Sequence, residues 1–373
     1  MMQTWKKATA AAVVLGVASL ALTSAHASDM FFGHQGYNQK NLVSNDTSKI
    51  PADHQDTELV NPWGDVFFPA GPFWLNENGS GQSALFLGDG SGVGGGSTAL
   101  AVTVPTPSGT GQSAPTGIVL NGTQAFQLKN KTTSIFIFDT EDGTISAWNL
   151  GTGFPGPAEL EVDNSAETCT NGATGAVYKA LAYGATTAGP FLYATNFRCG
   201  TVDVFDGTWA PAMAGKFRDP LIPPGYAPFG IVNISGNLFV TYAKQNAAKH
   251  DDEAGVGRGF VDVFDTSGNL IKRFAVRGAL NSPWGVALAP YNFGQVSNDI
   301  LIGNFGDGRI NAFDAHTGVF EGSLRDPSHR PISIDGLWSI VFGGGALSDP
   351  AQLYFTAGPN GETDGLFGRL TPQ

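Results

Sequence analysis

The architecture of the chain can be inferred from Pro283-Trp284-Gly285-Val286-Ala287-Leu288, which is followed, after a loop, by Ile300-Leu301-Ile302-Gly303-Asn304-Phe305-Gly306-Asp307-Gly308-Arg309-Ile310-Asn311-Ala312-Phe313. Short apolar or alternating runs separated by glycine-containing turns are typical of antiparallel strands. Asp-Gly between two such runs indicates a tight hairpin turn. The stretch therefore predicts a strand, a loop, a second strand, a tight turn and a third strand.

The opening strand of this unit occurs six times along the chain, and a period of roughly 40–60 residues is typical of propeller blades. When the small residue of each copy is aligned, the steps are 53, 63, 50, 55 and 54 residues; these residues are Gly64, Gly117, Ala180, Gly230, Gly285 and Ser339. The six copies are Pro62-Trp63-Gly64, Pro115-Thr116-Gly117, Lys179-Ala180-Leu181, Pro228-Phe229-Gly230, Pro283-Trp284-Gly285 and Leu337-Trp338-Ser339.

These repeats predict an all-β fold, a six-bladed β-propeller in which radial repetition leaves only short strand edges. The sixth unit ends with the strand 366–370 and has no fourth strand after it. We expect the segment 37–43 to supply that strand and to close the ring, so that residues 28–373 form a single domain. A β-sandwich would not explain six restarts, and a β-helix would repeat at shorter intervals.

Composition excludes other classes. The chain of 373 residues contains 51 Gly, 22 Pro and 26 Phe, and only 14% of its residues are charged. A coiled coil or a disordered chain would be richer in charge and poorer in aromatic residues. Lys and Arg number 20 against 32 Asp and Glu, a net charge of -12. No basic footprint exists for nucleic acid, so we do not expect it as a partner.

The first 27 residues have the features of a signal peptide. Lys6 and Lys7 precede an apolar run over residues 8–22, and Ala25-His26-Ala27 fits the cleavage rule for signal peptidase. The alternative is a membrane anchor, but the run is shorter than the roughly 20 residues that cross a bilayer. We expect a secreted protein, periplasmic or extracellular, that is monomeric and has no membrane span.

The two cysteines, Cys169 and Cys199, are expected to form a disulfide, because an isolated pair in an oxidising compartment is more often bonded than metal-bound. A zinc site would need further ligands. The histidines after the signal peptide show no spacing that brings two of them onto one helical face.

Strings in every predicted blade resemble a family of exported bacterial propellers. They include Leu59-Val60-Asn61-Pro62-Trp63-Gly64, Gly71-Pro72-Phe73-Trp74-Leu75, Tyr226-Ala227-Pro228-Phe229 and the segments 140–148, 193–206, 240–245, 303–313 and 353–359. The resemblance covers about residues 41–370. It implies the six-bladed fold and export, with no established activity and no catalytic residues to transfer. Some members carry a PEP-CTERM sorting tail, which this chain lacks.

Oxygen-bearing side chains stand at the end of the second strand in several blades. With Asn304 as the reference, the equivalent residues are Glu77, Asp139, Asn196, Tyr242 and Ala357. If Glu77, Asp139, Asn196 and Asn304 face the axis, their oxygens suit Ca²⁺ or Mg²⁺. The alternative is that Asp139 and Asn304 cap the glycine turns that follow them.

The longest insertion, residues 244–259, contains His250-Asp251-Asp252-Glu253 flanked by glycines. We expect it to form a cation site or a lid over the channel, with Tyr242, Lys244, Asp251 and Asp252 as ligand-binding residues. The alternative is a solvated loop. Trp63, Trp284 and Trp338 are interpreted as packing anchors rather than as a surface on which sugars stack.

Propellers bind ligands where loops of several blades converge, at the mouth of the channel. The sequence therefore favours a secreted module that binds an extracellular or periplasmic ligand or protein there. The first alternative is a metal-dependent hydrolase of the lactonase or esterase type, in which Glu77 or Asp139 activates water. The second is a structural spacer of the envelope or matrix.

Overall fold

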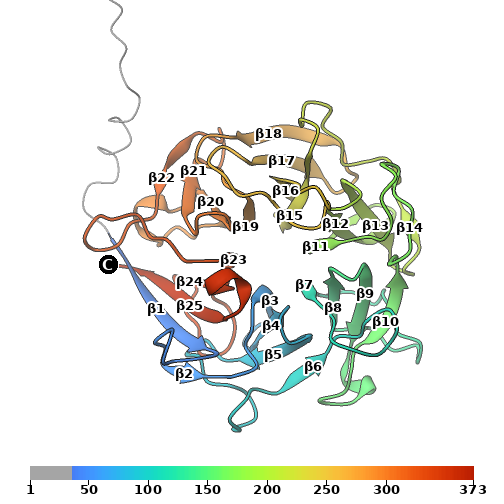
Figure 1. Cartoon of the computed structure of the whole chain (residues 1–373), viewed down its shortest axis with the longest axis horizontal. Coiled ribbons are helices and arrows are strands. Elements are labelled where there is room, and N and C mark those ends of the chain that lie inside the picture. The colour runs from blue at the N-terminus through green and yellow to red at the C-terminus, as the bar shows by residue number, and fades with distance from the viewer. Residues whose placement is uncertain (1–35) are drawn as a thin grey trace, which may run out of the picture.

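The computed structural model describes residues 36–373 and shows six sheets arranged radially around a central axis (Figure 1). Five sheets have four strands and the last has five. The predicted six-bladed β-propeller is confirmed. The predicted signal peptide, residues 1–27, lies outside the described residues. Within residues 36–373, no helix combines the length and the apolar character that a membrane crossing requires.

Blades one to three follow one another along the chain, each with its first strand at the axis. Blade one consists of β3 (Pro62–Phe67), β4 (Phe73–Glu77), β5 (Gln82–Phe86) and β6 (Ala101–Thr103). Blade two consists of β7 (Pro115–Leu120), β8 (Phe136–Thr140), β9 (Thr144–Trp148) and β10 (Glu159–Asp163), with the short helix η2 (Leu150–Thr152). Blade three consists of β11 (Tyr178–Thr186), β12 (Gly189–Asn196), β13 (Thr201–Asp206) and β14 (Pro211–Ala212).

Blades four to six complete the circle. Blade four consists of β15 (Tyr226–Ile234), β16 (Asn237–Lys244), β17 (Phe260–Asp265) and β18 (Leu270–Val276). Blade five consists of β19 (Pro283–Leu288), β20 (Ile300–Asn304), β21 (Ile310–Phe313) and β22 (Phe320–Ser323), with η3 (Gly294–Val296). Blade six consists of β23 (Leu337–Phe342), β24 (Leu353–Ala357), β25 (Leu366–Pro372), β1 (Tyr37–Ser44) and β2 (His54–Gln55), with α1 (Pro359–Glu362).

The ring is closed by the N-terminal strand, as predicted. Strand β1 pairs antiparallel with β25 from Tyr37 opposite Pro372 to Ser44 opposite Leu366. The first and the last described strands therefore lie side by side in blade six. Strand β2 adds a short parallel edge to β1.

All six inner strands carry a β-bulge at the same place, which explains the recurrent small residue of the repeat. The register shifts across residues 63–64, 116–117, 179–180, 229–230, 284–285 and 338–339. Each bulge has two residues, and the second of them, such as Gly64, lies against the backbone of the next blade. A Cβ at Gly64 would lie 2.5 Å from the Thr116 oxygen, and one at Gly285 would lie 2.7 Å from the Trp338 oxygen. Glycine permits this close approach.

Polar side chains from the second strands hold the bulges in place. The Gly230 amide donates to Thr241 Oγ1 at 2.7 Å, and Thr195 Oγ1 donates to the Phe229 carbonyl of the next blade at 2.9 Å. These bonds satisfy backbone groups that the bulge removes from the strand ladder. The first bulge residue of each blade is thereby fixed near the axis; these residues are Trp63, Thr116, Lys179, Phe229, Trp284 and Trp338.

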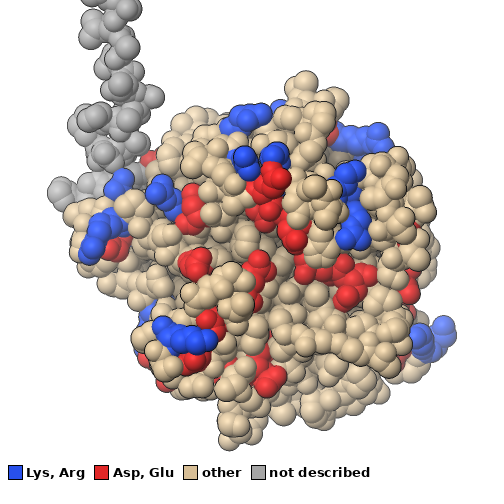
Figure 2. All heavy atoms as spheres, viewed as in Figure 1, with Lys and Arg blue, Asp and Glu red and all other residues tan. Residues whose placement is uncertain are grey.

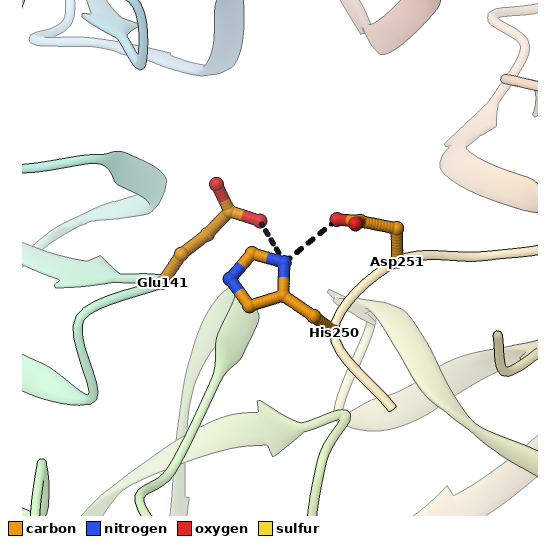
Figure 3. A group of neighbouring side chains, drawn as sticks. All are labelled: Glu141, His250 and Asp251. Atoms are coloured by element: carbon orange, nitrogen blue, oxygen red, sulfur yellow. Dashed lines mark hydrogen bonds and ion pairs between the residues drawn. The ribbon is translucent and has the colours of Figure 1, made fainter. Parts of the chain in front are cut away.

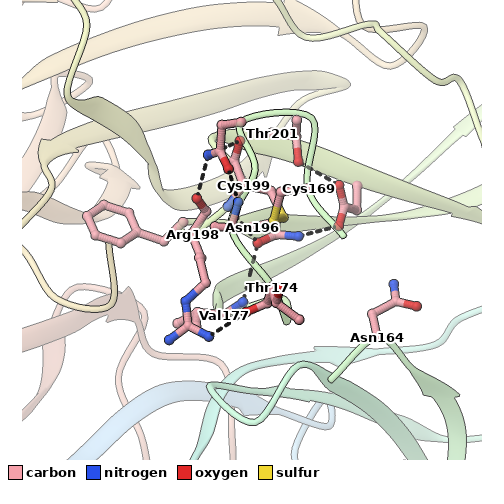
Figure 4. The surroundings of a disulfide bond; sticks show 12 residues. Asn164, Cys169, Thr174, Val177, Asn196, Arg198, Cys199 and Thr201 are labelled. Carbon is pink, nitrogen blue, oxygen red and sulfur yellow. Dashed lines mark hydrogen bonds between the residues drawn. A yellow bond between two sulfur atoms is a disulfide. The ribbon is translucent and has the colours of Figure 1, made fainter. Parts of the chain in front are cut away.

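The disulfide between Cys169 and Cys199 is present, as predicted (Figure 4). It joins the connection before blade three to the turn between β12 and β13. Asn196 Oδ1 accepts from the Val177 and Cys199 amides at 3.3 and 3.2 Å. This cross-link and its hydrogen bonds fasten the loop that leads into the inner strand carrying Lys179.

Candidate functional site at the channel mouth

A plug of aromatic side chains divides the channel into two halves. The Trp63 and Trp338 rings stack with centroids 3.5 Å apart, and Trp284 meets them edge-on at 6.3 and 5.8 Å. Phe305 stacks on Trp338 at 4.0 Å. The three tryptophans come from blades one, five and six, so they can meet only near the axis. The three tryptophans belong to one buried cluster, which confirms that they are packing anchors.

Lys179 is the charged exception among the first bulge residues. Its side chain is only 2% exposed, and its Nζ forms an ion pair with Glu141 and lies 3.4 Å from Asp251 Oδ1. The ammonium also lies 5.1 Å from the centre of the Trp63 ring and 5.8 Å from that of Phe197. Opposite charges and aromatic faces offset the cost of taking a cation out of water. Lys179 thus forms a charged floor on the plug.

Glu141, His250 and Asp251 converge above this floor (Figure 3). His250 Nδ1 lies 2.7 Å from Asp251 Oδ1 and 3.9 Å from Glu141 Oε1. The hydrogen bond with His250, and then the Lys179 ammonium, lower the pKa of Asp251 to about 2. Asp251 is therefore ionised at neutral pH, and its side chain is 61% exposed. A carboxylate is presented to solvent at the mouth.

This trio has the geometry of a possible metal-binding group, but Lys179 competes for the same atoms. Its ammonium contacts Glu141 Oε1 and Asp251 Oδ1, the two oxygens that face His250. A divalent ion on those oxygens would lie close to a positive charge in a poorly solvated place, where repulsion is strong. The amino group of Lys179 is the cation that these carboxylates bind in the structure.

Further acidic groups surround the trio. Glu362 Oε2, from α1, accepts from Asn61 Nδ2 at 2.8 Å, and Asn78 Nδ2 donates to Glu141 Oε2 at 3.0 Å. Burial raises the pKa of Glu362 and of Asp252. Figure 2 shows acidic side chains around the centre of this face, with most Lys and Arg farther out. Such a distribution attracts positively charged ligands.

The long insertion of blade four carries His250 and Asp251 to the mouth. Gln245 and Asp252 form a β-bridge across it, and the Asn246 amide donates to the Asp251 carbonyl at 2.8 Å. Lys244 forms an ion pair with Glu253 at the base of the insertion. These bonds set Asp251 above Lys179.

Of the four residues predicted to bind a ligand, two lie near the Lys179 ammonium. Asp251 contacts it, and that ammonium lowers the pKa of Asp252, although burial outweighs this effect. Lys244 pairs with Glu253 and supports the insertion. Tyr242 is buried and lines a separate pocket between blades three and four. The structure therefore does not bring these four residues together.

The predicted ring of cation ligands rests on a register that is wrong for Asp139. Glu77, Asn196 and Asn304 lie opposite Pro62, Tyr178 and Pro283, at equivalent positions. In blade two the equivalent residue, opposite Pro115, is Thr140. Because successive side chains alternate between the faces of a strand, Asp139 points to the opposite face.

The contacts of these four residues are local. Asp139 Oδ1 accepts from Gly117 N at 2.6 Å and Thr116 Oγ1 at 2.9 Å. No hydrogen bond or ion pair within the described part of the chain joins any two of the four. A Ca²⁺ or Mg²⁺ ion shared by them stays a prediction. The turn-capping alternative fits Asn304, which donates to Asp307 of the turn that follows it, but not Asp139, whose partners lie in the bulge of β7. The partners of the other three are Ser80 and Gln82 for Glu77, Val177, Cys199 and Asp203 for Asn196, and Ala279 and Asp307 for Asn304.

Sequence reasoning missed Lys179 and Glu141 as site residues. One signal for Lys179 was available, because it occupies a position where the other blades have Trp, Thr or Phe. For Glu141 no such signal exists. Its contacts with Lys179 and His250 join three different blades, and their geometry follows from the ring and not from local spacing.

We expect the buried carboxyl group of Asp139 to make the protein less stable as the pH rises. Burial raises the pKa of Asp139 from 3.8 to about 7. Between these values the folded protein holds a proton that the unfolded chain has released, so the free energy of unfolding falls with pH. Urea titrations at pH 5 and pH 8 measure this effect. Between these pH values the free energy of unfolding of Asp139→Asn should fall by about 2 kcal/mol less than that of the wild type.

The matched control is Asp53→Asn, which alters a surface carboxylate paired with Lys40 and should keep the wild-type pH dependence. Equal pH dependence in Asp139→Asn and the wild type would show that Asp139 is ionised throughout this range.

Comparisons with known proteins place the chain among viral relatives. No family model matches it. It is 31% identical over 338 residues to the uncharacterized protein R648 of Acanthamoeba polyphaga mimivirus, covering 88% of this chain and 78% of the relative. It is 30% identical over 342 residues to protein L690 of the same virus, covering 88% and 84%. The resemblance had pointed to bacterial proteins, whereas these relatives are viral, and a sorting tail finds no support.

Solved structures share the fold. A streptogramin B lyase superposes with a TM-score of 0.51 at 12% identity, covering 91% of this chain and 98% of that one. A glucose dehydrogenase superposes with a TM-score of 0.52 at 13% identity, covering 84% and 96%. At such low identity the likeness extends to the propeller architecture alone.

Proposed function

Because the chain belongs to the family of the uncharacterized mimivirus proteins R648 and L690, we propose a function from its own channel mouth: the protein is a binding module that takes a small organic cation there. Such a ligand carries one or more ammonium groups. Its ammonium would pair with the Asp251 carboxylate on the solvent-exposed side, away from the Lys179 ammonium, between the insertion of blade four and α1.

The buried charge of Lys179 is the observation that carries this proposal. Five blades use uncharged residues at the first bulge position, so the plug does not need a charge for packing. A buried ammonium with its counter-ions is costly, and ionisable groups buried in a cleft are typical of functional sites. Glu141, Asp251 and Glu362 outnumber the single ammonium, which favours a cationic ligand over an anionic one.

We also propose that the protein acts outside the cytoplasm. The predicted signal peptide is one support for this proposal. The second is the disulfide between Cys169 and Cys199, because such bonds persist in oxidising compartments.

A metal-dependent hydrolase is the second candidate, and the trio of Glu141, His250 and Asp251 favours it. A divalent ion held there would polarise an ester or lactone carbonyl and lower the pKa of a bound water. Lys179 opposes this function, since its ammonium holds the oxygens that would bind the ion. Within residues 36–373, Glu77 and Asp139, the predicted bases, form no hydrogen bond or ion pair with the trio and bond elsewhere.

Calorimetric titration with putrescine, with glycerol as a neutral control, tests the proposal. We expect the wild type to bind putrescine and not glycerol, and Asp251→Asn to weaken binding at least tenfold, since one charge-assisted contact is worth about 1.5–3 kcal/mol. Asp53→Asn should bind like the wild type.

No heat with putrescine, or equal affinity in Asp251→Asn, would overturn the cation site. Titrations with Mg²⁺, Ca²⁺ and Mn²⁺ distinguish the second candidate. Stoichiometric binding of one of them that is lost in His250→Ala would replace the organic cation with a metal and justify a screen of esters and lactones.

A further inference from the structure

The half of the channel beyond the plug is an apolar cavity. Its volume is about 500 Å³, within the range of small-molecule sites. Its walls are the inner strands beyond their bulges. The residue directly after the bulge is aliphatic in five blades and aspartate in one; these residues are Asp65, Ile118, Leu181, Ile231, Val286 and Ile340.

Asp65 is therefore a single carboxyl group in an aliphatic wall. Its Oδ1 accepts a hydrogen bond from Ser339 Oγ, whereas Oδ2 is buried and has no hydrogen-bond partner. No Lys, Arg or His lines the cavity within the described residues. A buried polar atom without a partner costs free energy, and burial raises the pKa of Asp65 to about 7. A sixth aliphatic residue at this position would pack equally well, so packing does not explain why the residue is Asp65.

The entrance of the cavity carries no charged side chain among the described residues. Leu288, at the end of β19, lines the cavity and is 43% exposed, and Phe342 lines it at the end of β23. Trp284 also lines the cavity and belongs to the plug that separates it from the mouth. The aliphatic part of a ligand can thus enter from this face and reach the plug without passing charged side chains.

We propose that this cavity binds a small aliphatic molecule with one hydrogen-bond-donating head group, an alcohol or an amine. The head group donates to Asp65 Oδ2, and the hydrocarbon part packs against the aliphatic wall. Burial of the hydrocarbon part supplies affinity, and the ionised Asp65 carboxylate, at a pH above 7, selects a donor over an anionic head. This site is separate from the mouth and does not depend on the function proposed for it.

Titration with 1-octanol, octylamine and octanoate, followed by tryptophan fluorescence, tests the assignment, since Trp284 lines the cavity. We expect octanol and octylamine to bind the wild type and octanoate to bind at least tenfold more weakly. Asp65→Leu should weaken octylamine and octanol at least tenfold. This variant completes the aliphatic wall and removes the buried Oδ2 that has no partner, so it is expected to fold.

Asp53→Asn, a surface substitution, is the matched control and should bind 1-octanol, which carries no ammonium group for the mouth, like the wild type. Asp65→Leu should bind putrescine at the mouth unchanged, so that the two sites fail or succeed independently. Absence of octanol and octylamine binding, equal affinity in Asp65→Leu, or equal affinity for octanoate would each overturn the assignment.

Discussion

Replacing Lys179 with methionine is expected to lower the free energy of unfolding by about 3–5 kcal/mol, the usual cost of removing one partner of a buried ion pair. The side chain of Lys179 is 2% exposed and that of Glu141 is 12% exposed. Methionine keeps much of the hydrocarbon volume of the lysine side chain. The loss of stability therefore reflects the Glu141 carboxylate, which is left without its cationic partner. Urea titration at neutral pH measures it.

Two companion variants separate charge from packing. Lys244→Met removes an ammonium whose pair with Glu253 is exposed, so it should lower the stability far less than Lys179→Met. The double variant Lys179→Met with Glu141→Gln neutralises both partners and should recover most of the lost stability. If the double variant were as unstable as Lys179→Met alone, the loss would come from packing on the plug and not from charge.

Replacing Trp338 with alanine is expected to cost about 3–5 kcal/mol, because a large buried side chain is removed from a site that cannot collapse around the gap. Trp338 packs on Trp63 and Phe305, and its Nε1 donates to Asn61 Oδ1 at 2.9 Å. The surrounding rings are anchored in three other blades, which limits their movement; they are Trp63, Phe229, Trp284 and Phe305. Chemical denaturation measures the loss.

Trp209→Ala is the matched control, since Trp209 is partly exposed and packs on Phe126 in blade two with ring centroids 5.1 Å apart. It should lose clearly less stability than Trp338→Ala. A loss in Trp338→Ala no greater than in Trp209→Ala would mean that the centre of the ring adapts to the gap, and that the plug is not a rigid partition.

The fold could be predicted because the sequence pattern of one blade recurs six times along the chain. The recurrence of Pro-Trp-Gly and its variants marks the inner strand, and the structure gives the physical reason: a bulge that brings its second residue against the next blade. Closure by the segment 37–43 could be predicted because the sixth unit lacked a strand.

The site could be predicted only in part. The insertion of blade four was identified as a channel feature, and Asp251 lies at the mouth. Asp139 was misplaced because a shift of one residue, which leaves the strand assignment intact, moves a side chain to the opposite face. The pairing of Lys179 with Glu141 depends on how neighbouring blades meet, and no local pattern encodes that distance.

The pairing of β1 with β25 also dictates the order in which the molecule can be completed. Contacts between distant parts of a chain carry the largest loop-closure entropy, and Tyr37 opposite Pro372 spans nearly the whole propeller. Blade six can be sealed only after every other blade has been synthesised. Until then β1 has no partner in β25, and the free strand edges of this blade can pair with other chains. Aggregation during biosynthesis is thus concentrated in one blade, and a ligand that binds the closed ring would favour its completion.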